Sequence, residues 1–185
     1  MFGKAAFAFG ISLAAAGAAH AHSVTVIGTN ADAIACFRAA DSDARRPDAI
    51  ETCGVALASN DLDNQDRVAT LVNRGIIHFR LEQFPEALAD FDAAMVIEPR
   101  QADAMVNRGI TMIAAGEDID RSLAFINEGL QRGPQRPWVA YYGRAVGNEL
   151  AGRDADAYRD YQRAQELRPT WALPRRALAR FSVRG

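Results

Sequence analysis

The sequence is poor in the residues that build metal and redox centres. Its 185 residues include only two Cys and three His, and it has no Cys-x-x-Cys pair, which excludes a zinc ribbon and a covalent haem site. The formal net charge of −2, from 21 basic and 23 acidic residues, is too weak to favour non-specific binding to nucleic acid or a membrane surface. We therefore expect no metal, no cofactor and no nucleic-acid partner.

The first 21 residues have the layout of a secretory signal peptide. Lys4, the only lysine in the chain, precedes an uncharged apolar run over residues 5–19, and Ala19-His20-Ala21 offers small residues for cleavage. The run is shorter than the roughly 20 residues that span a bilayer. We expect cleavage after Ala21, export to a bacterial periplasm and no integral membrane span in the mature chain.

Export changes how the two cysteines are interpreted. Cys36 and Cys53 lie 17 positions apart, and in an oxidising compartment an even number of cysteines favours a disulfide. The alternative is two small buried apolar side chains with no bond between them. We predict the bridge, which would constrain the unfolded chain by about 3 kcal/mol.

A repeat of helical hairpins sets the architecture. Pro99, Pro134 and Pro169 are spaced 35 residues apart, and each follows two amphipathic segments that a short turn separates. In each unit the proline lies just beyond the second segment, where it prevents the helix from continuing. The first segments carry related sequences: Leu71-Val72-Asn73-Arg74-Gly75, Met105-Val106-Asn107-Arg108-Gly109 and Tyr141-Tyr142-Gly143-Arg144-Ala145.

These motifs resemble the tetratricopeptide repeat (TPR), and they are most similar to the bacterial, exported type with Asn-Arg-Gly repeats. The resemblance implies an all-α fold: a right-handed solenoid of stacked antiparallel helix pairs with a helical cap at each end. Only His78 departs from the signature in the first unit, at an aromatic packing position where a core histidine is expected rather than a catalytic base. The matching residues of that unit are Leu71, Gly75, Ala87, Phe91, Ala94 and Pro99.

The chain divides accordingly into seven segments. We predict a signal peptide (1–21), a flexible N-terminal segment (22–30), a degenerate helix pair and loop (31–67), three repeats (68–101, 102–136 and 137–171) and a C-terminal capping helix (172–185). Residues 60–66 are expected to be a polar loop before the first repeat. The two ends differ in charge: residues 31–66 hold eight acids and three Arg, whereas residues 167–185 hold five Arg and no acid.

The resemblance implies non-catalytic binding of a protein or peptide, as a scaffold or assembly factor of the cell envelope. No nucleophile with a base and an orienting group is visible, so we do not expect an enzyme. The alternative is a structural envelope component that associates with copies of itself into a homo-oligomer.

In the family, a stripe on the first helix of each repeat lines a concave groove, where Lys or Arg beside Asn can hold a peptide's terminal carboxylate. Val72, Val106 and Tyr142 stand here where a cation would help, so we do not transfer that activity. An apolar groove either binds a hydrophobic segment or is covered by the chain's own termini or a second copy. The predicted binding residues are Val72, Asn73, Ile76, Phe79, Val106, Asn107, Arg108, Ile110, Ile113, Tyr142 and Val146.

Two further expectations concern single residues of this surface. Arg74 and Arg144 have an Asp at the matching place of their second helices, which predicts the pairs Arg74–Asp90 and Arg144–Asp160. The middle repeat has Phe125 there, so Arg108 is either a structural arginine or free to hold a ligand carboxylate. We also expect Phe79→Asp or Ile110→Asp to abolish partner capture without loss of the fold.

Overall fold

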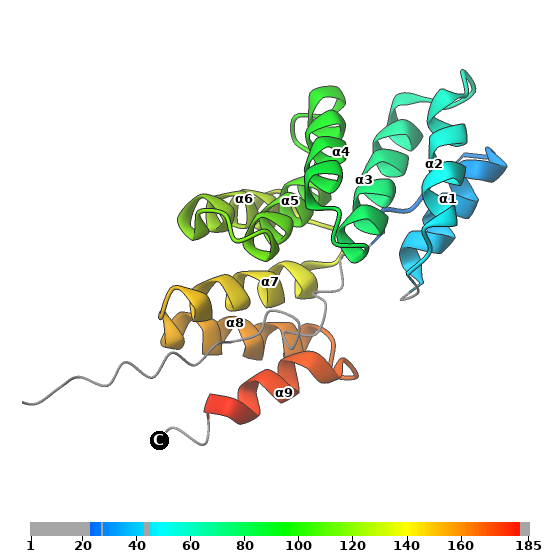
Figure 1. Ribbon diagram of the computed structural model, residues 1–185. Coiled ribbons are helices and arrows are strands. Elements are labelled where there is room, and N and C mark those ends of the chain that lie inside the picture. Colours follow the sequence, from blue (N-terminus) through cyan, green and yellow to red (C-terminus); the bar gives the residue numbers. More distant parts are fainter. Residues whose placement is uncertain (1–22, 27, 43–44, 182–185) are drawn as a thin grey trace, which may run out of the picture.

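The structure is a computed structural model that describes residues 23–26, 28–42 and 45–181, so the predicted signal peptide lies outside the described residues. Within these ranges the chain forms nine α-helices and no strand, which confirms the all-α prediction (Figure 1). None of the described helices is both long and apolar enough to cross a membrane. The helices are α1 (Ala31–Asp41), α2 (Asp48–Ala58), α3 (Asn64–Arg80), α4 (Phe84–Ile97), α5 (Ala102–Ala114), α6 (Ile119–Arg132), α7 (Pro137–Leu150), α8 (Asp154–Leu167) and α9 (Ala172–Phe181).

The helices form successive hairpins that stack in chain order, α1 with α2, α3 with α4, α5 with α6 and α7 with α8, and α9 packs on α8 (Figure 1). α3 begins earlier than expected, because the Asp63 carboxylate caps it by accepting the backbone N–H of Asp66 at 2.8 Å. The prediction of a polar loop through residue 66 is therefore wrong for its last three residues.

The core of each hairpin is built from the residues of the repeat signature. Phe91, Ile126 and Tyr161, spaced 35 residues apart, are at most 1% exposed. Gly75 lets α3 approach α4 closely, because a Cβ atom at Gly75 would lie 2.6 Å from the Phe91 ring. The 35-residue repeat of the sequence is thus a repeat of buried contacts.

The N-terminal hairpin is held by a disulfide. Cys36 on α1 and Cys53 on α2 are bonded and fully buried, as the sequence predicts. The link fixes α1 beside α2, and both helices pack on α3.

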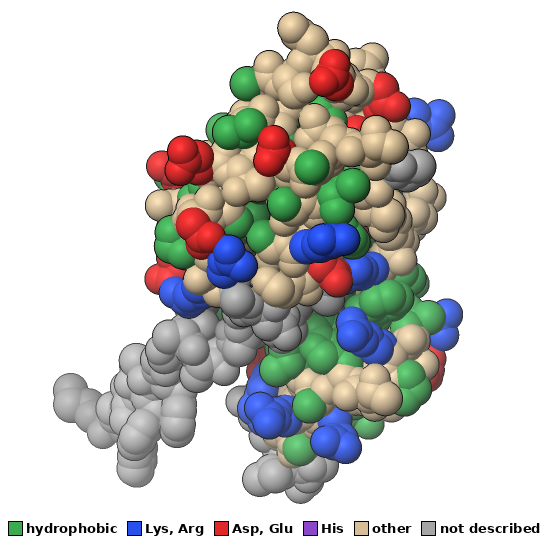
Figure 2. All heavy atoms as spheres, turned by 90° about the vertical axis from the view of Figure 1, so that its right-hand side faces the viewer, with side chains coloured by type: hydrophobic (Ala, Val, Ile, Leu, Met, Phe, Trp, Pro, Cys, Tyr) green, Lys and Arg blue, Asp and Glu red, His purple; other side chains and the backbone are tan. Residues whose placement is uncertain are grey.

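The two ends of the array differ in charge, as the composition indicates. Figure 2 shows acidic side chains mainly over the upper part of one face, with arginines around a hydrophobic area in the lower part. Arg175 and Arg176 on α9 are exposed.

Candidate peptide-binding site

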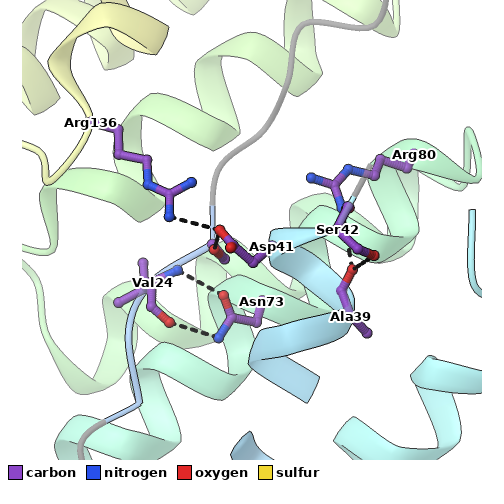
Figure 3. Close-up of polar contacts among 8 residues, drawn as sticks. Val24, Ala39, Asp41, Ser42, Asn73, Arg80 and Arg136 are labelled. Carbon is purple, nitrogen blue, oxygen red and sulfur yellow. Dashed lines mark hydrogen bonds and ion pairs between the residues drawn. The ribbon is translucent and has the colours of Figure 1, made fainter. Parts of the chain in front are cut away.

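A short extended segment of the chain, residues 23–26, lies against α3. The backbone N–H of Val24 donates to Oδ1 of Asn73, and Nδ2 of Asn73 donates to the Val24 carbonyl oxygen, both at 2.8 Å (Figure 3). Val24 is 5% exposed and Asn73 is fully buried. A side-chain amide presents an N–H donor and a carbonyl acceptor side by side, so Asn73 pairs with a residue of extended chain as a neighbouring strand would.

The segment has further anchors on both sides of Asn73. The Ser23 hydroxyl donates to Asp41 and the Gly28 N–H donates to Asp66, each at 2.8 Å. Asn30 then caps α1 by accepting the N–H of Ala33 at 2.9 Å. In the described part of the segment predicted to be flexible, backbone and side-chain donors are thus bound by α1 and α3.

Arg136, just before α7, binds the residue of α1 that also holds the start of this segment. Its guanidinium donates to Asp41 at 2.7 Å, and the same Asp41 oxygen accepts the Ser23 hydroxyl (Figure 3). We call Ser23, Asp41 and Arg136 the clasp. It joins the end of α1 to the residue that precedes α7.

Two buried groups support the clasp. Arg80, which is 7% exposed, donates to the carbonyl oxygens of Ala39 and Ser42 and so ties the end of α1 to α3 (Figure 3). On the other side, Asp103 accepts the Gln135 N–H at 3.1 Å beside Arg136. Burial raises the pKa of the Asp103 carboxyl to about 6.

Most of the predicted groove stripe proves to be packed against neighbouring helices. Ile110 and Ile113 on α5 lie against α7, where Cβ atoms at Gly143 and Gly147 would come within 2.5 and 2.9 Å of them. Their assignment to an open groove is therefore wrong: the two glycines let α7 come close, and the isoleucines fill the contact between repeats. Val106 likewise contacts α6 at Gly129.

The other members of the stripe are also largely covered. Val72 and Ile76 are fully buried in the core cluster that contains Val24. Phe79 lies 6.0 Å from the Phe84 ring, centroid to centroid. In the third repeat Tyr142 contacts Tyr161 and Trp171 at 5.4 and 4.9 Å, while Val146 is partly buried.

The three equivalent arginines are all paired. Arg74 binds Asp90 and Arg144 binds Asp160, each through two hydrogen bonds of 2.6–2.8 Å, which confirms both predicted pairs. Arg108 is not free for a ligand carboxylate, because its Nε donates to Asp92 on the preceding helix α4 at 2.6 Å. Its guanidinium also lies 4.2 Å above the Phe125 ring, at the place where the other repeats carry Asp.

Comparison with solved structures decides the fold. No protein-family model matches the chain, and no curated protein matches it. The first TPR domain of human RPAP3 superposes with a TM-score of 0.57 at 19% identity, covering 62% of this chain and 89% of that domain. The first TPR of Spaghetti (RPAP3) bound to the HSP90 peptide SRMEEVD gives the same TM-score and identity, covering 67% of this chain and 96% of that one.

The chain has a TPR-like fold. In this TPR-like array α3, α5 and α7 are the first helices of the three repeats, and Asn73 and Asn107 hold equivalent places on α3 and α5. Asn107 is 3% exposed, and no hydrogen bond joins its side-chain amide to any described residue. The structure thus contains one asparagine engaged with extended backbone and an equivalent one that is not engaged by the described part of the chain.

Sequence reasoning found Asn73 and Asn107 but missed the residues around them. The run Ser23-Val24-Thr25-Val26 was a usable signal, since its last three residues are β-branched and favour extended structure in a chain whose other described segments are mostly helical. Nothing in the sequence marks Asp41 or Arg136, because their contact bridges 95 residues.

The TPR-like array also has a polar hollow on its surface. A hollow of about 530 Å³ lies between α6, α7 and α8, and its arginines Arg144, Arg153 and Arg159 each pair with an aspartate there. No cluster of three or more His, Cys, Asp or Glu that could hold a metal ion occurs among the described residues. The hollow therefore offers satisfied ion pairs rather than groups free for chemistry.

Proposed function

We propose that the protein is a non-catalytic scaffold that binds an extended peptide segment of a partner protein through the first-helix face of its TPR-like array. The observation that carries the proposal is the Asn73–Val24 pairing, in which one buried side chain binds both backbone groups of an extended residue. This pairing involves only main-chain groups of the bound residue, so a peptide from another protein can make the same two hydrogen bonds. The RPAP3 domain with this fold binds an HSP90 peptide, which supports peptide binding by such a fold.

Asn107 supplies the second contact of the proposed site. α3 and α5 contact each other in the array, so a peptide that engages both asparagines runs across both helices. The expected ligand is thus an extended segment that crosses α3 and α5.

The compartment is part of the proposal. Residues 1–21 have the pattern of a cleaved signal peptide, and the Cys36–Cys53 bridge suits an oxidising compartment. We infer that the protein works after export, in the bacterial periplasm, as a scaffold or assembly factor of the cell envelope.

In-cell crosslinking followed by mass spectrometry tests the proposal. We expect Asn107→Ala to lose a partner that the wild-type chain captures from the exported fraction, with an unchanged melting temperature. Asn60→Ala is the matched control, because it removes an exposed amide from the turn between α2 and α3. Identical capture by all three proteins would contradict the proposal. If only copies of the chain itself were captured, and light scattering gave an oligomer, the self-associating component would be the better description.

A further inference from the structure

We propose that residues 23–26 are an internal occupant of the peptide site, and that the partner segment which displaces them has their chemistry: extended, uncharged and β-branched at the buried position. This inference rests on the proposed function and adds its ligand class and its regulation.

The first step of the argument is the composition of the segment. Residues 23–29 read Ser-Val-Thr-Val-Ile-Gly-Thr and contain no charged residue. Branching at Cβ restricts side-chain rotation in a helix and favours extended backbone. In an array otherwise built of helices, residues 23–26 contribute no helix and lie on α3 as a bound peptide would.

The second step is the alternation of its side chains. Val24 is buried in the same apolar cluster as Ala40 and Val72, Thr25 is exposed, and Val26 is partly buried against that cluster. The site therefore accepts one apolar side chain, binds both backbone groups of that same residue through Asn73, and lets the next side chain face solvent. Any extended segment with a β-branched residue at the Val24 place can reproduce these contacts.

The third step is the charge around the segment. Two carboxylates flank it, Asp41 at Ser23 and Asp66 at Gly28, and each accepts a hydrogen bond from the segment. Asp41 is already paired with Arg136, whereas a peptide carboxylate placed at the Gly28 end would lie beside the like charge of Asp66. The site thus favours an uncharged segment over an acidic peptide such as SRMEEVD, the HSP90 peptide to which the first TPR of Spaghetti (RPAP3) is bound.

Tethering sets how strongly the segment competes. A segment joined to its own site acts at a high effective concentration, and a partner's apparent affinity falls by the fraction of molecules whose site is free. Weakening the segment without touching α3 should therefore raise affinity for a peptide added in trans.

The test uses the mature chain, residues 22–185, and a fluorescent synthetic peptide of residues 22–30, His-Ser-Val-Thr-Val-Ile-Gly-Thr-Asn. In the variant Val24→Asp the chain's own segment would bury a carboxylate and is expelled. We expect fluorescence anisotropy to show at least about tenfold tighter peptide binding than in the wild type. Adding Asn73→Ala to this variant should abolish the gain. Thr25→Asp is the matched control, since it adds the same charge at an exposed position, and it should bind like the wild type.

Other outcomes are equally clear. Equal binding by the wild type and Val24→Asp would overturn the inference; if crosslinking still depended on Asn107, the proposed function would stand without it. A dimer of the wild type that dissociates on Val24→Asp would mean that a second copy supplies the segment, which also overturns it. Val24→Gly, which removes the buried side chain and adds no charge, makes the same comparison if Val24→Asp does not fold.

Discussion

At the scale of single residues, the equivalent arginines show how one position serves two kinds of contact. Arg144 binds Asp160 within its repeat and also reaches Asn127 on the preceding helix α6 at 2.8 Å. Arg108 makes the same backward contact through Asp92 but meets a Phe125 ring within its repeat. These side chains therefore tie each hairpin to the one before it.

Arg144→Met tests the energetic weight of such a pair. Asp160 is only 7% exposed, and removing its partner would leave a buried carboxylate uncompensated. We expect the free energy of unfolding in urea to fall by about 3 kcal/mol. Arg159→Met on α8 is the control, because its pair with Asp156 is exposed and should contribute less than about 1 kcal/mol. Equal losses in the two variants would show that burial does not decide the effect.

Asp103 predicts an unusual dependence of stability on pH. Its folded pKa of about 6 exceeds the ordinary 3.8, so between these values the folded state binds the proton more tightly than the unfolded state. Its stabilising contribution is thus complete below pH 3.8 and is lost as the pH rises through 6.

Asp103→Asn should remove this loss while keeping an oxygen that accepts the Gln135 N–H. We expect the variant to exceed the wild type by up to about 3 kcal/mol in unfolding free energy at pH 7.5, and to match it near pH 4. The measurement is urea unfolding across this pH range, with the exposed Asp61→Asn as control. A difference that did not change with pH would argue against a titrating Asp103.

At the scale of elements, α5 packs against α6 within its own hairpin and against α7 of the next hairpin. Ile110 is 3% exposed and lies against Gly143 of α7. We now expect Ile110→Asp to unfold the protein or lower its melting temperature sharply, because it would bury a charge between two repeats. Val96→Asp is the control, since Val96 on α4 is 81% exposed. Circular dichroism melts distinguish the two; a native melt for Ile110→Asp would restore the open-groove interpretation.

The helices were predictable because their signals are local. Gly75 and Phe91 contact each other within one hairpin, so their contact could be predicted from their spacing in the sequence. The role of Ile110 was not predictable in this way, because it depends on how closely α7 packs. The partner of Asn73 lies 49 residues upstream in a segment with no helical periodicity. Asn73 could therefore be predicted as a site residue, whereas its contact with Val24 could not.

At the scale of the whole molecule, the clasp adds a contact between hairpins that are not adjacent in the chain. In a solenoid each repeat contacts only the adjacent ones. Here Arg136, immediately before α7, binds Asp41 at the end of α1. The contact is half-exposed, with 24% and 45% of the two side chains accessible, so its strength should depend on salt.

A double-mutant cycle with Asp41→Asn and Arg136→Gln measures the clasp. We expect a coupling of about 0.5–1 kcal/mol at low salt that falls in 1 M NaCl. Hydrogen exchange of the Val24 amide should also become faster in either single variant, because Asp41 anchors Ser23 beside it. A salt-independent coupling would contradict an electrostatic clasp.

The long span of these contacts has a kinetic consequence. Hairpin contacts close loops within one repeat, whereas the Val24–Asn73 and Asp41–Arg136 contacts close loops of 49 and 95 residues. Loop-closure entropy grows with length, and contacts distant in sequence form slowly. The helical array should therefore assemble first and the N-terminal segment dock last. During every folding event Asn73 is then briefly in place before the N-terminal segment binds it. A peptide present at that stage competes on equal terms with the protein's own segment.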